Sequence, residues 1–429
     1  MSRVIVVLWG REVGVIDDGD GIPKFAYYPE FRRSGLEISP LKMPLSRGDV
    51  VSFKDLARKA SFMGLPGVFA DSLPDSFGNK IIENYFRVKY GDKGKNHLSN
   101  AEKLLYVGDR GMGALEYRPA YAIDDNNDAL DISMMVSAAR RIIRGDLDRD
   151  ATSIMHVGES AGGARSKALV GWNPRTNEFI AGTRNIPDSY EHWILKIDGT
   201  DGAGPSGYGR SEYAYALMAK EAGIMIPETR LLQDREFTHF MIKRFDRKEN
   251  GQKIHMSSLS GLIHSDFNEP KTVGYEDLLN VVASLTKDKS SIAEAFRRMV
   301  FNILARNQDD HVKNISFLME PDGKWRLSPA YDLTFAVGQG VTSTHQMTVN
   351  GKAENIHLGD MMAVADRFEI PNADILIAEV RDGVAGWRLC AGRAGVAKER
   401  IDRIDEILSI EIANVKNLAA KITVPRTSS

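Results

Sequence analysis

Apolar and polar residues follow two spacings along this chain, and together these predict both strands and helices. Short apolar runs separated by turn residues occur at Val4–Leu8, Val13–Ile16 and Phe25–Tyr28, which is typical of a small antiparallel meander. Apolar residues three or four positions apart predict helices at Lys80–Val88 and Ile132–Ile143. The first part of the chain is therefore expected to combine a small sheet with helices.

The middle of the chain, from about residue 151 to residue 246, is predicted to be rich in strands. The expected strands are Leu169–Gly171, Glu178–Ile180, His192–Ile197 and Phe240–Arg247. One helix, Ser211–Ala219, interrupts them and closes near Gly223.

Long amphipathic helices dominate the remainder of the chain. Ser291–Arg306 is predicted to be a helix that ends just before a polar loop, and Asp402–Ile422 is predicted to be another. The charged stretch Gly145–Asp150 is a plausible domain boundary because a glycine opens it. The expected domains are residues 1–150, 151–246 and 247–429.

Composition sets loose limits on the class of protein. At 429 residues the chain is long enough for two or three domains, and an apolar fraction of 43% suffices for ordinary cores. No segment approaches the roughly 18 apolar residues of a membrane span, and Met1–Gly10 is predicted to be a strand rather than a signal peptide. A single cysteine, Cys390, argues against disulfides, and the net charge of −2 gives no global sign of nucleic-acid binding. We expect a reduced, cytoplasmic protein with no membrane association.

The most informative segment runs from Asp309 to Asn314 and is followed by a predicted hairpin and then by Asp332. The hairpin is expected because two apolar runs flank the turn Pro321–Gly323. A hairpin of this length would return the chain so that Asp332 lies near Asn314. Three polar side chains would then converge.

Such a convergence suits phosphoryl transfer. Oxygen ligands hold Mg²⁺ against ATP phosphates, and a nearby carboxylate accepts the proton of the attacking hydroxyl. Asp309 and Asn314 have the interval of a protein-kinase catalytic loop, so Asp309 fits the base, and Asn314 and Asp332 fit the metal ligands. Asp and Asn are common in loops, so the interval alone is weak; the hairpin and Asp332 make it more specific.

A run of small residues, Gly158–Lys167, is a candidate phosphate loop. Small residues let backbone N–H groups approach phosphates, and Lys167 adds positive charge. The run is not a P-loop, because Ala164 stands where that motif requires lysine.

The same run supports a competing hypothesis, a serine hydrolase. Gly158–Gly162 matches the G-x-S-x-G nucleophile elbow around Ser160, and Asp309 or Asp332 and then His345 follow in the appropriate order. The elbow requires a helix directly after the serine. The strand, turn and strand predicted here favour the phosphate loop.

Two further segments are candidates for nucleotide binding. Lys196 lies in an apolar, strand-like run, where an ATP phosphate would compensate its charge, and Glu212 on the next helix could pair with it. Lys196 on a solvated strand face and Glu212 as a favourable helix-terminal charge are equally open. The backbone of Lys243–Phe245 would lie where an adenine edge is hydrogen-bonded, unless Lys243 and Arg244 are simply surface charges.

These motifs together resemble the HipA toxins of bacterial type II toxin–antitoxin systems, which are serine/threonine kinases. The resemblance covers nearly the whole chain, and many motifs in the correct order are more specific than any one. The matching segments are Phe25–Phe31, Pro44–Gly48, Leu73–Ser76, Ser160–Lys167, Lys196, Lys243–Arg247, Asp309–Asn314 and Ser328–Leu333.

The resemblance implies a two-lobed, protein-kinase-like α+β fold with an amino-terminal accessory β/α domain, a nucleotide-binding lobe and a helical carboxy-terminal lobe. It implies Asp309 as catalytic base, Asn314 and Asp332 as Mg²⁺ ligands, and Ser160 as a site of inactivating autophosphorylation. The residues that it implies around ATP are Gly162, Gly163, Ala164, Arg165, Ser166, Lys167, Lys196, Lys243, Arg244, Phe245, His311, Lys313 and Tyr331.

The resemblance also implies partners: a HipB-like helix-turn-helix antitoxin that makes most of the DNA contact, and a protein substrate such as an aminoacyl-tRNA synthetase. The chain departs from the family's pattern at Gln308 and Asp310, where members often have Thr or Ser and then a small residue, and at Lys243, often Glu. The sequence does not decide whether Gln308 and Asp310 change substrate choice. A small-molecule or lipid kinase, the hydrolase and a non-catalytic antitoxin–DNA scaffold remain as alternatives.

Overall fold

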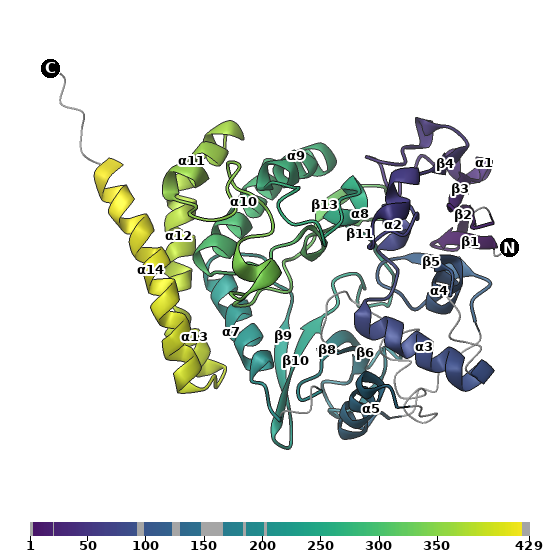
Figure 1. The fold of residues 1–429 in the computed structure, drawn as a ribbon, viewed down its shortest axis with the longest axis horizontal. Helices are drawn as coiled ribbons and strands as arrows, with labels where there is room; N and C mark the ends of the chain where they lie inside the picture. The colour runs from purple at the N-terminus through teal and green to yellow at the C-terminus, as the bar shows by residue number, and fades with distance from the viewer. Residues whose placement is uncertain are drawn as a thin grey trace. The chain divides into compact units, whose positions relative to one another are not determined.

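The computed structural model describes residues 3–19, 21–91, 98–121, 129–146, 166–182, 186–200 and 204–422, with side chains to residue 414 (Figure 1). The chain forms two compact units. The first unit comprises Met1–Gly209, Glu228–Asn268 and Ser316–Trp325, and the second comprises Arg210–Pro227, Glu269–Ile315 and Arg326–Ser429. The domain boundaries expected at residues 150 and 246 stay a prediction.

The first unit begins with a five-stranded antiparallel sheet in the order β4-β3-β2-β1-β5. Its strands are β1 (Arg3–Leu8), β2 (Arg11–Asp17), β3 (Lys24–Tyr27), β4 (Val50–Ser52) and β5 (Leu115–Arg118). The predicted meander is confirmed, since β1 pairs with β2 and β2 with β3. A Cβ atom at Gly14 would lie 2.1 Å from the carbonyl oxygen of Ala26, so the close approach of β2 and β3 requires glycine there.

A second five-stranded sheet has the order β7-β6-β8-β10-β9, with every neighbouring pair antiparallel. Its strands are β6 (Lys167–Trp172), β7 (Phe179–Ala181), β8 (Glu191–Lys196), β9 (Thr229–Asp234) and β10 (Phe237–Lys243). The strands predicted in this part of the chain are confirmed within a few residues.

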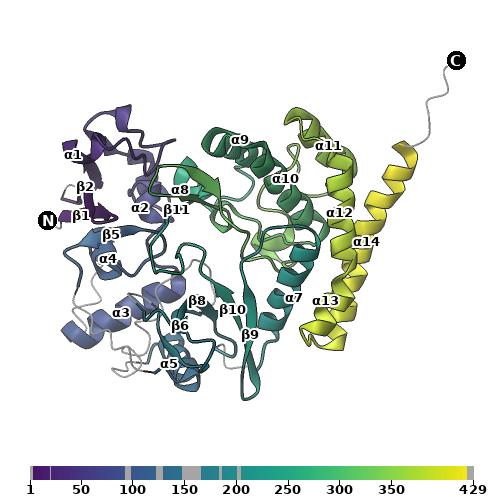
Figure 2. The ribbon, with the colours of Figure 1, turned by 180° about the vertical axis from the view of Figure 1, so that it is seen from behind.

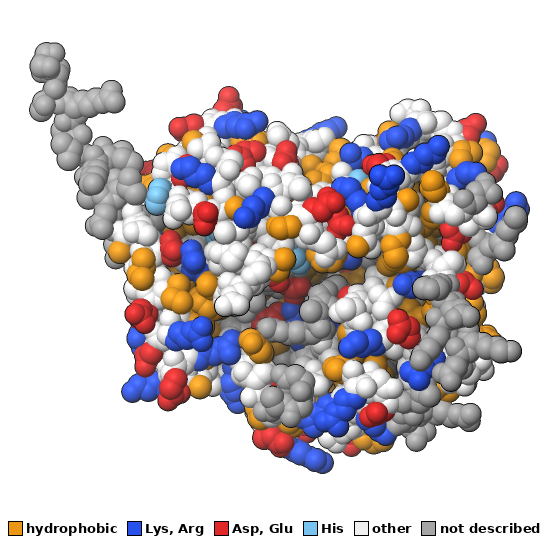
Figure 3. Space-filling model, viewed as in Figure 1, with side chains coloured by type: hydrophobic (Ala, Val, Ile, Leu, Met, Phe, Trp, Pro, Cys, Tyr) orange, Lys and Arg blue, Asp and Glu red, His pale blue; other side chains and the backbone are white. Residues whose placement is uncertain are grey.

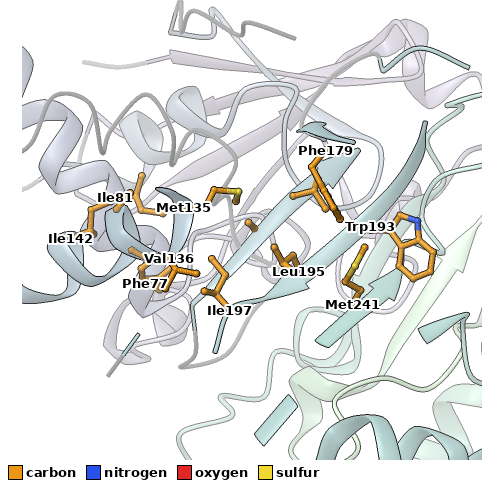
Figure 4. Packing of buried hydrophobic residues seen from close by; sticks show 14 of the residues in the cluster. Phe77, Ile81, Met135, Val136, Ile142, Phe179, Trp193, Leu195, Ile197 and Met241 are labelled. Carbon is orange, nitrogen blue, oxygen red and sulfur yellow. The ribbon is translucent and has the colours of Figure 1, made fainter. Parts of the chain in front are cut away.

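Two helices cover one face of this sheet and form a core with it. They are α3 (Ser76–Tyr90) and α5 (Ile132–Arg144), both predicted from their apolar spacing. Phe77 and Ile81 of α3, Met135 of α5, and Trp193 and Leu195 of β8 belong to one buried hydrophobic cluster (Figure 4). Alternate residues of a strand face opposite sides, so this core fixes which side chains of β6 and β8 face the other way.

The remaining elements of the first unit include a third sheet, ordered β11-β12-β13. A turn at Gly323, with φ +83°, joins β12 to β13, which confirms the predicted hairpin. The elements are α1 (Pro29–Arg32), η1 (Leu45–Arg47), η2 (Lys54–Arg58), α2 (Gly67–Ala70), α4 (Asn100–Val107), β11 (His255–Ser258), α8 (Leu259–Ile263), β12 (Ser316–Met319) and the start of β13 (Trp325–Leu327).

The second unit is mainly helical. Besides most of α7 (Tyr208–Glu221), it contains α9 (Tyr275–Thr286), α10 (Lys289–Leu304), η4 (Val312–Asn314), η5 (Gly340–Ser343), α11 (Leu358–Arg367), α12 (Ala373–Ala385), α13 (Trp387–Arg393) and α14 (Lys398–Ile422). In Figures 1 and 2, α12 lies between α10 and α14.

Helix α10 sets the position of the loop that follows it. It begins after Asp288, whose carboxylate caps the backbone N–H groups of Ser290 and Ser291. It ends at Leu304 because Arg306 has a left-handed backbone, with φ +52°. The predicted helix Ser291–Arg306 is confirmed with its bounds shifted by two residues at each end.

Candidate active site

The segment after α10 runs beside the segment after Asp332. Asn307 and Ala336 form a parallel bridge, the backbone N–H of Gln308 donates to the carbonyl of Ala336 at 3.2 Å, and Ala336 N–H donates to Arg306 at 3.1 Å. These backbone bonds lie within the second unit. They hold the two loops that carry the candidate catalytic residues side by side.

Asp309 and Asn314 are joined directly. The Asn314 amide nitrogen donates to the backbone carbonyl of Asp309 at 3.0 Å, which leaves the amide oxygen as the atom able to bind a cation. The Asp309 side chain is 43% exposed, and its Oδ1 accepts a hydrogen bond from Gln346 Nε2 at 2.7 Å. A half-exposed carboxylate held by one oxygen is suited to proton transfer.

Asp332 lies close to the same place. The Tyr331 hydroxyl donates to the carbonyl of Lys313 at 2.9 Å, and Asp332 itself has a left-handed backbone, with φ +55°. Burial lowers the pKa of His311, whereas the nearby carboxylates of Asp309 and Asp332 act to raise it. His311 Nε2 lies 4.0 Å from Asp309 Oδ1. The charges of both carboxylates therefore act on this imidazole.

Asp310, the residue after the candidate base, binds a different set of groups in the second unit. Its side chain is fully buried and accepts hydrogen bonds from the Tyr275 hydroxyl (2.9 Å), His345 Nδ1 (2.9 Å) and the backbone N–H of Gln346 (2.8 Å). The Tyr275 hydroxyl also accepts from Asn302 on α10 at 2.8 Å. Asp310, a departure from the family pattern, therefore anchors the loop that carries the candidate base.

Sequence reasoning missed this buried network. It considered His345 only as a hydrolase base beside Asp309 or Asp332, whereas its Nδ1 binds Asp310 and its side chain is 3% exposed. In the sequence, Asp310 stands out only as a departure from the pattern of the HipA toxins. The one signal in the sequence is the presence of Gln308 and Asp310 on either side of Asp309. Nothing in the spacing indicates that Asp310 forms hydrogen bonds with residues 35 positions away.

The donor set around Asp309 fits a magnesium ion that is shared with a nucleotide. Within the ranges that the structure describes, no group of three or more His, Cys, Asp or Glu side chains is arranged to hold a metal ion unaided. Mg²⁺ bound to a nucleotide needs only one or two protein oxygens, because phosphates and waters supply the rest. The Asn314 amide oxygen and the Asp332 carboxylate would be such oxygens.

In the first unit, two candidate nucleotide-binding lysines are neighbours. Lys167 on β6 and Lys196 on β8 are directly opposite in the antiparallel register, so they share one face of the sheet. Ala168 and Leu195, which follow and precede them, belong to the core under α3 and α5, so the lysines face away from it. Two ammonium groups on one sheet face attract anions.

Lys196 lies close to an aromatic side chain. Its Nζ lies 5.6 Å from the ring centre of Phe240, its cross-strand neighbour on β10. Ser166, beside Lys167, donates its hydroxyl to Thr200 at 3.3 Å. The ion pair between Lys196 and Glu212 stays a prediction.

Arg244 is not a surface charge, because its side chain is fully buried, whereas the Lys243 side chain is 31% exposed. Lys243 Nζ binds Glu191 at 2.9 Å. Arg244 and Asp246 have fully buried side chains 2.8 Å apart, and Arg247 joins them at 2.8 Å from Asp246. Burial alone would raise the pKa of Asp246, but the two guanidinium groups hold it far below its usual range.

This buried triad ties the end of β10 to the segment before β5. The Asp246 carboxylate accepts from Gly113 N–H at 2.7 Å, and Arg247 donates to the carbonyls of Gly111 and Gly113 at 3.1 and 2.9 Å. The segment proposed to carry adenine contacts, Lys243–Phe245 at the end of β10, is therefore held by the segment before β5. Sequence reasoning did not connect the segment that contains Gly111 and Gly113 with the segment Arg244–Arg247.

Several predicted residues lie outside the described ranges. They are Ser160, Gly162, Gly163, Ala164 and Arg165, together with the rest of the G-x-S-x-G motif. Their assignments stay predictions.

Two family models match the chain. The model described as HipA N-terminal domain matches residues 4–118. The model described as HipA-like C-terminal domain matches residues 159–387, which is more than half of the 429-residue chain.

Curated relatives match over shorter stretches. "Putative kinase Y4dM" of Sinorhizobium fredii (strain NBRC 101917 / NGR234) is 26% identical over 235 residues, which are 50% of this chain and 56% of the relative. A protein of Haemophilus influenzae, also described as a putative kinase, is 27% identical over 135 residues, 28% of this chain and 39% of the relative. The match thus spans about half, or less, of each relative's length.

A solved structure shows the fold. It is the complex described as the Shewanella oneidensis MR-1 toxin–antitoxin system HipA, HipB and its operator DNA. One chain aligns with a TM-score of 0.67, covering 95% of both chains at 15% identity. The expected mixed α+β, kinase-like fold with an amino-terminal β/α part is confirmed.

The surface and the helices add two facts. Acidic and basic side chains are interspersed on the face shown in Figure 3, in keeping with the net charge of −2. Among the described residues, every helix is too short or too polar to cross a membrane.

Proposed function

The chain belongs to the HipA family, and from this premise we propose that it is an ATP-dependent serine/threonine protein kinase. The observation that carries the proposal is the arrangement in the second unit, where Asn314 is hydrogen-bonded to Asp309 and the Tyr331 hydroxyl joins the chain beside Asp332 to Lys313. A half-exposed carboxylate near two oxygen atoms that can bind Mg²⁺ suits phosphoryl transfer. In the first unit, the opposed Lys167 and Lys196 are the proposed contacts to ATP phosphates.

In the proposed reaction, the substrate hydroxyl oxygen attacks the γ-phosphorus of ATP. The bond between that phosphorus and the oxygen of the leaving ADP breaks, and the hydroxyl proton passes to the Asp309 carboxylate. A magnesium ion held by Asn314 and Asp332 would neutralise phosphate charge. His311, Lys313 and Tyr331 would line the nucleotide beside these residues, and Lys196 would hold phosphate oxygens.

Further parts of the proposal rest on the family resemblance. We infer that Ser160 is autophosphorylated, since a dianionic group in a phosphate loop would repel ATP phosphates and switch the enzyme off. A HipB-like antitoxin is the proposed partner and makes most of the DNA contact, which agrees with a net charge of −2 on this chain. The proposed target is a translation protein, for example an aminoacyl-tRNA synthetase.

The test is phosphoryl transfer from γ-labelled Mg-ATP into a bacterial extract, with label in protein separated from label in metabolites. The wild type is expected to label serine or threonine in protein. Asp309→Asn is expected to lose at least about 100-fold in rate, since general base catalysis contributes 10²–10⁴-fold. Asp322→Asn, a 52% exposed carboxylate in the β12–β13 turn, is the matched control and should behave as the wild type.

Two results would contradict the proposal. Label confined to metabolites would replace the protein kinase by a small-molecule or lipid kinase. Equal labelling by the wild type and Asp309→Asn would remove Asp309 from the chemistry.

A further inference from the structure

Gln346 makes a short hydrogen bond to the candidate base. Its Nε2 donates to Asp309 Oδ1 at 2.7 Å, although the two residues are 37 positions apart. The Gln346 residue is only 5% exposed. A neutral amide buried against an ionised carboxylate forms a charge-assisted bond, which is stronger than one between neutral groups.

The backbone of Gln346 is fixed on both sides. Its N–H donates to Asp310 Oδ1 at 2.8 Å, and its carbonyl accepts from Lys271 N–H at 2.6 Å. The side chain therefore projects from a rigid point. Gln346 therefore binds two adjacent residues of the loop: its backbone N–H binds Asp310, and its side chain binds Asp309.

Asp310 in turn is held by helices. Its Oδ2 accepts from Tyr275 on α9, and Tyr275 accepts from Asn302 on α10. Asn302 Oδ1 accepts from Asn307 Nδ2 at 2.9 Å, at the start of the catalytic loop. This chain of hydrogen bonds connects two helices to the loop, and its last bond reaches the Asp309 carboxylate.

We propose that Gln346 is a positioning residue that fixes the orientation of the Asp309 carboxylate for proton abstraction. With Oδ1 held by the amide, rotation of the carboxylate is restricted and Oδ2 is presented to the substrate hydroxyl. The inference rests on the proposed kinase function and adds a residue to it. Misplacement of a reacting group by about 1 Å can cost 10²-fold in rate, so the orientation of this carboxylate should strongly affect the rate of phosphoryl transfer.

The first variant is Gln346→Ala, which removes the amide. Its kcat is expected to fall about 10–100-fold while the KM for ATP stays within about twofold, because Gln346 acts on the base and not on nucleotide binding. Gln339→Ala, an exposed residue of the same segment, is the matched control and should keep the wild-type kcat.

The second variant, Gln346→Glu, has nearly the same shape and changes the pH dependence. Two carboxyl groups within hydrogen-bond distance cannot both ionise easily, so the pair keeps one proton until the pH exceeds a raised pKa. Below that pKa the protonated Glu donates a hydrogen bond as Gln does; above it the two charges repel. The kcat of Gln346→Glu relative to wild type is therefore highest at low pH and falls as the pH rises, whereas Gln339→Glu shows no such fall.

The outcomes separate this inference from the proposed function. If the wild type transfers phosphate and Gln346→Ala keeps its kcat, Gln346 does not position the base and only this inference fails. A Gln346→Glu activity that is reduced equally at all pH values would show a purely structural role and also overturn it. If Gln346→Ala does not fold, the pH profile of Gln346→Glu decides. A wild type that transfers no phosphate to protein instead refutes the proposed function.

Discussion

The Asp310→Asn substitution should destabilise the second unit although it changes only one side-chain atom. Asp310 is fully buried and accepts three hydrogen bonds, from Tyr275, His345 and the backbone N–H of Gln346. An Asn side chain has one accepting oxygen, and its NH₂ group cannot accept. If this oxygen keeps the hydrogen bonds from Tyr275 and His345, the NH₂ group faces the backbone N–H of Gln346. That buried N–H donor then loses its acceptor.

The magnitude follows from these contacts. Hydrogen bonds to a charged group contribute about 1.5–3 kcal/mol each, and an unsatisfied buried donor costs about 1–3 kcal/mol. Loss of one bond and weakening of the other two therefore predicts about 3 kcal/mol lower free energy of unfolding. For a unit of 150–250 residues this corresponds to a Tm lower by about 6–12 °C.

The assay is urea unfolding at pH 7 of the wild type, Asp310→Asn, Tyr275→Phe and the double variant. Tyr275→Phe removes the hydroxyl shared by Asp310 and Asn302. If the network acts as one unit, the double variant should be more stable than the sum of the single effects by more than about 0.5 kcal/mol. Asp322→Asn in the exposed turn should change stability by less than about 0.5 kcal/mol. An Asp310→Asn protein as stable as this control would refute the reasoning.

Two other predictions concern the first unit. Lys196→Met should weaken ATP binding about 10–100-fold in calorimetric titration, since a hydrogen bond to a charged group contributes about 1.5–3 kcal/mol. The control, Lys324→Met in the exposed turn, should leave ATP binding unchanged. An unchanged Kd for Lys196→Met would remove Lys196 from the nucleotide site. Burial lowers the pKa of His255 from 6.5 to about 4, so the folded state keeps this residue neutral and the unfolded state takes up a proton below pH 6.5. Its contribution to stability is thus fully present above pH 6.5 and is lost as the pH falls towards 4, and urea unfolding of His255→Asn should show a smaller loss over this range than the wild type. Equal losses would show that His255 is not the titrating group.

The local elements of the catalytic segment were predictable because short-range rules produce them. The turn around Gly323 joins two strands as expected, and the helix before Asp309 ends within two residues of its predicted end. The contact between Asn314 and Asp309 is likewise local. Patterns of apolar spacing and turn residues carry this information without knowledge of the rest of the chain.

The partners of Asp310 and Arg244 were not predictable in the same way. Asp310 binds residues on α9 and in the segment before α11, and Arg244 and Asp246 bind the backbone of Gly111 and Gly113 more than 130 positions away. Such contacts depend on how helices and sheets pack. A buried carboxylate or arginine has no spacing pattern of its own, so the sequence offers only its unexpected presence near a motif.

The most direct test of the central claim is mass spectrometry of the purified, dephosphorylated protein after incubation with Mg-ATP. Intact mass and peptide mapping should find one phosphate on Ser160 in the wild type and in Asp322→Asn, and none in Asp309→Asn prepared identically. Phosphate on Asp309→Asn at the wild-type level would contradict the assignment of Asp309 as the base that accepts the hydroxyl proton.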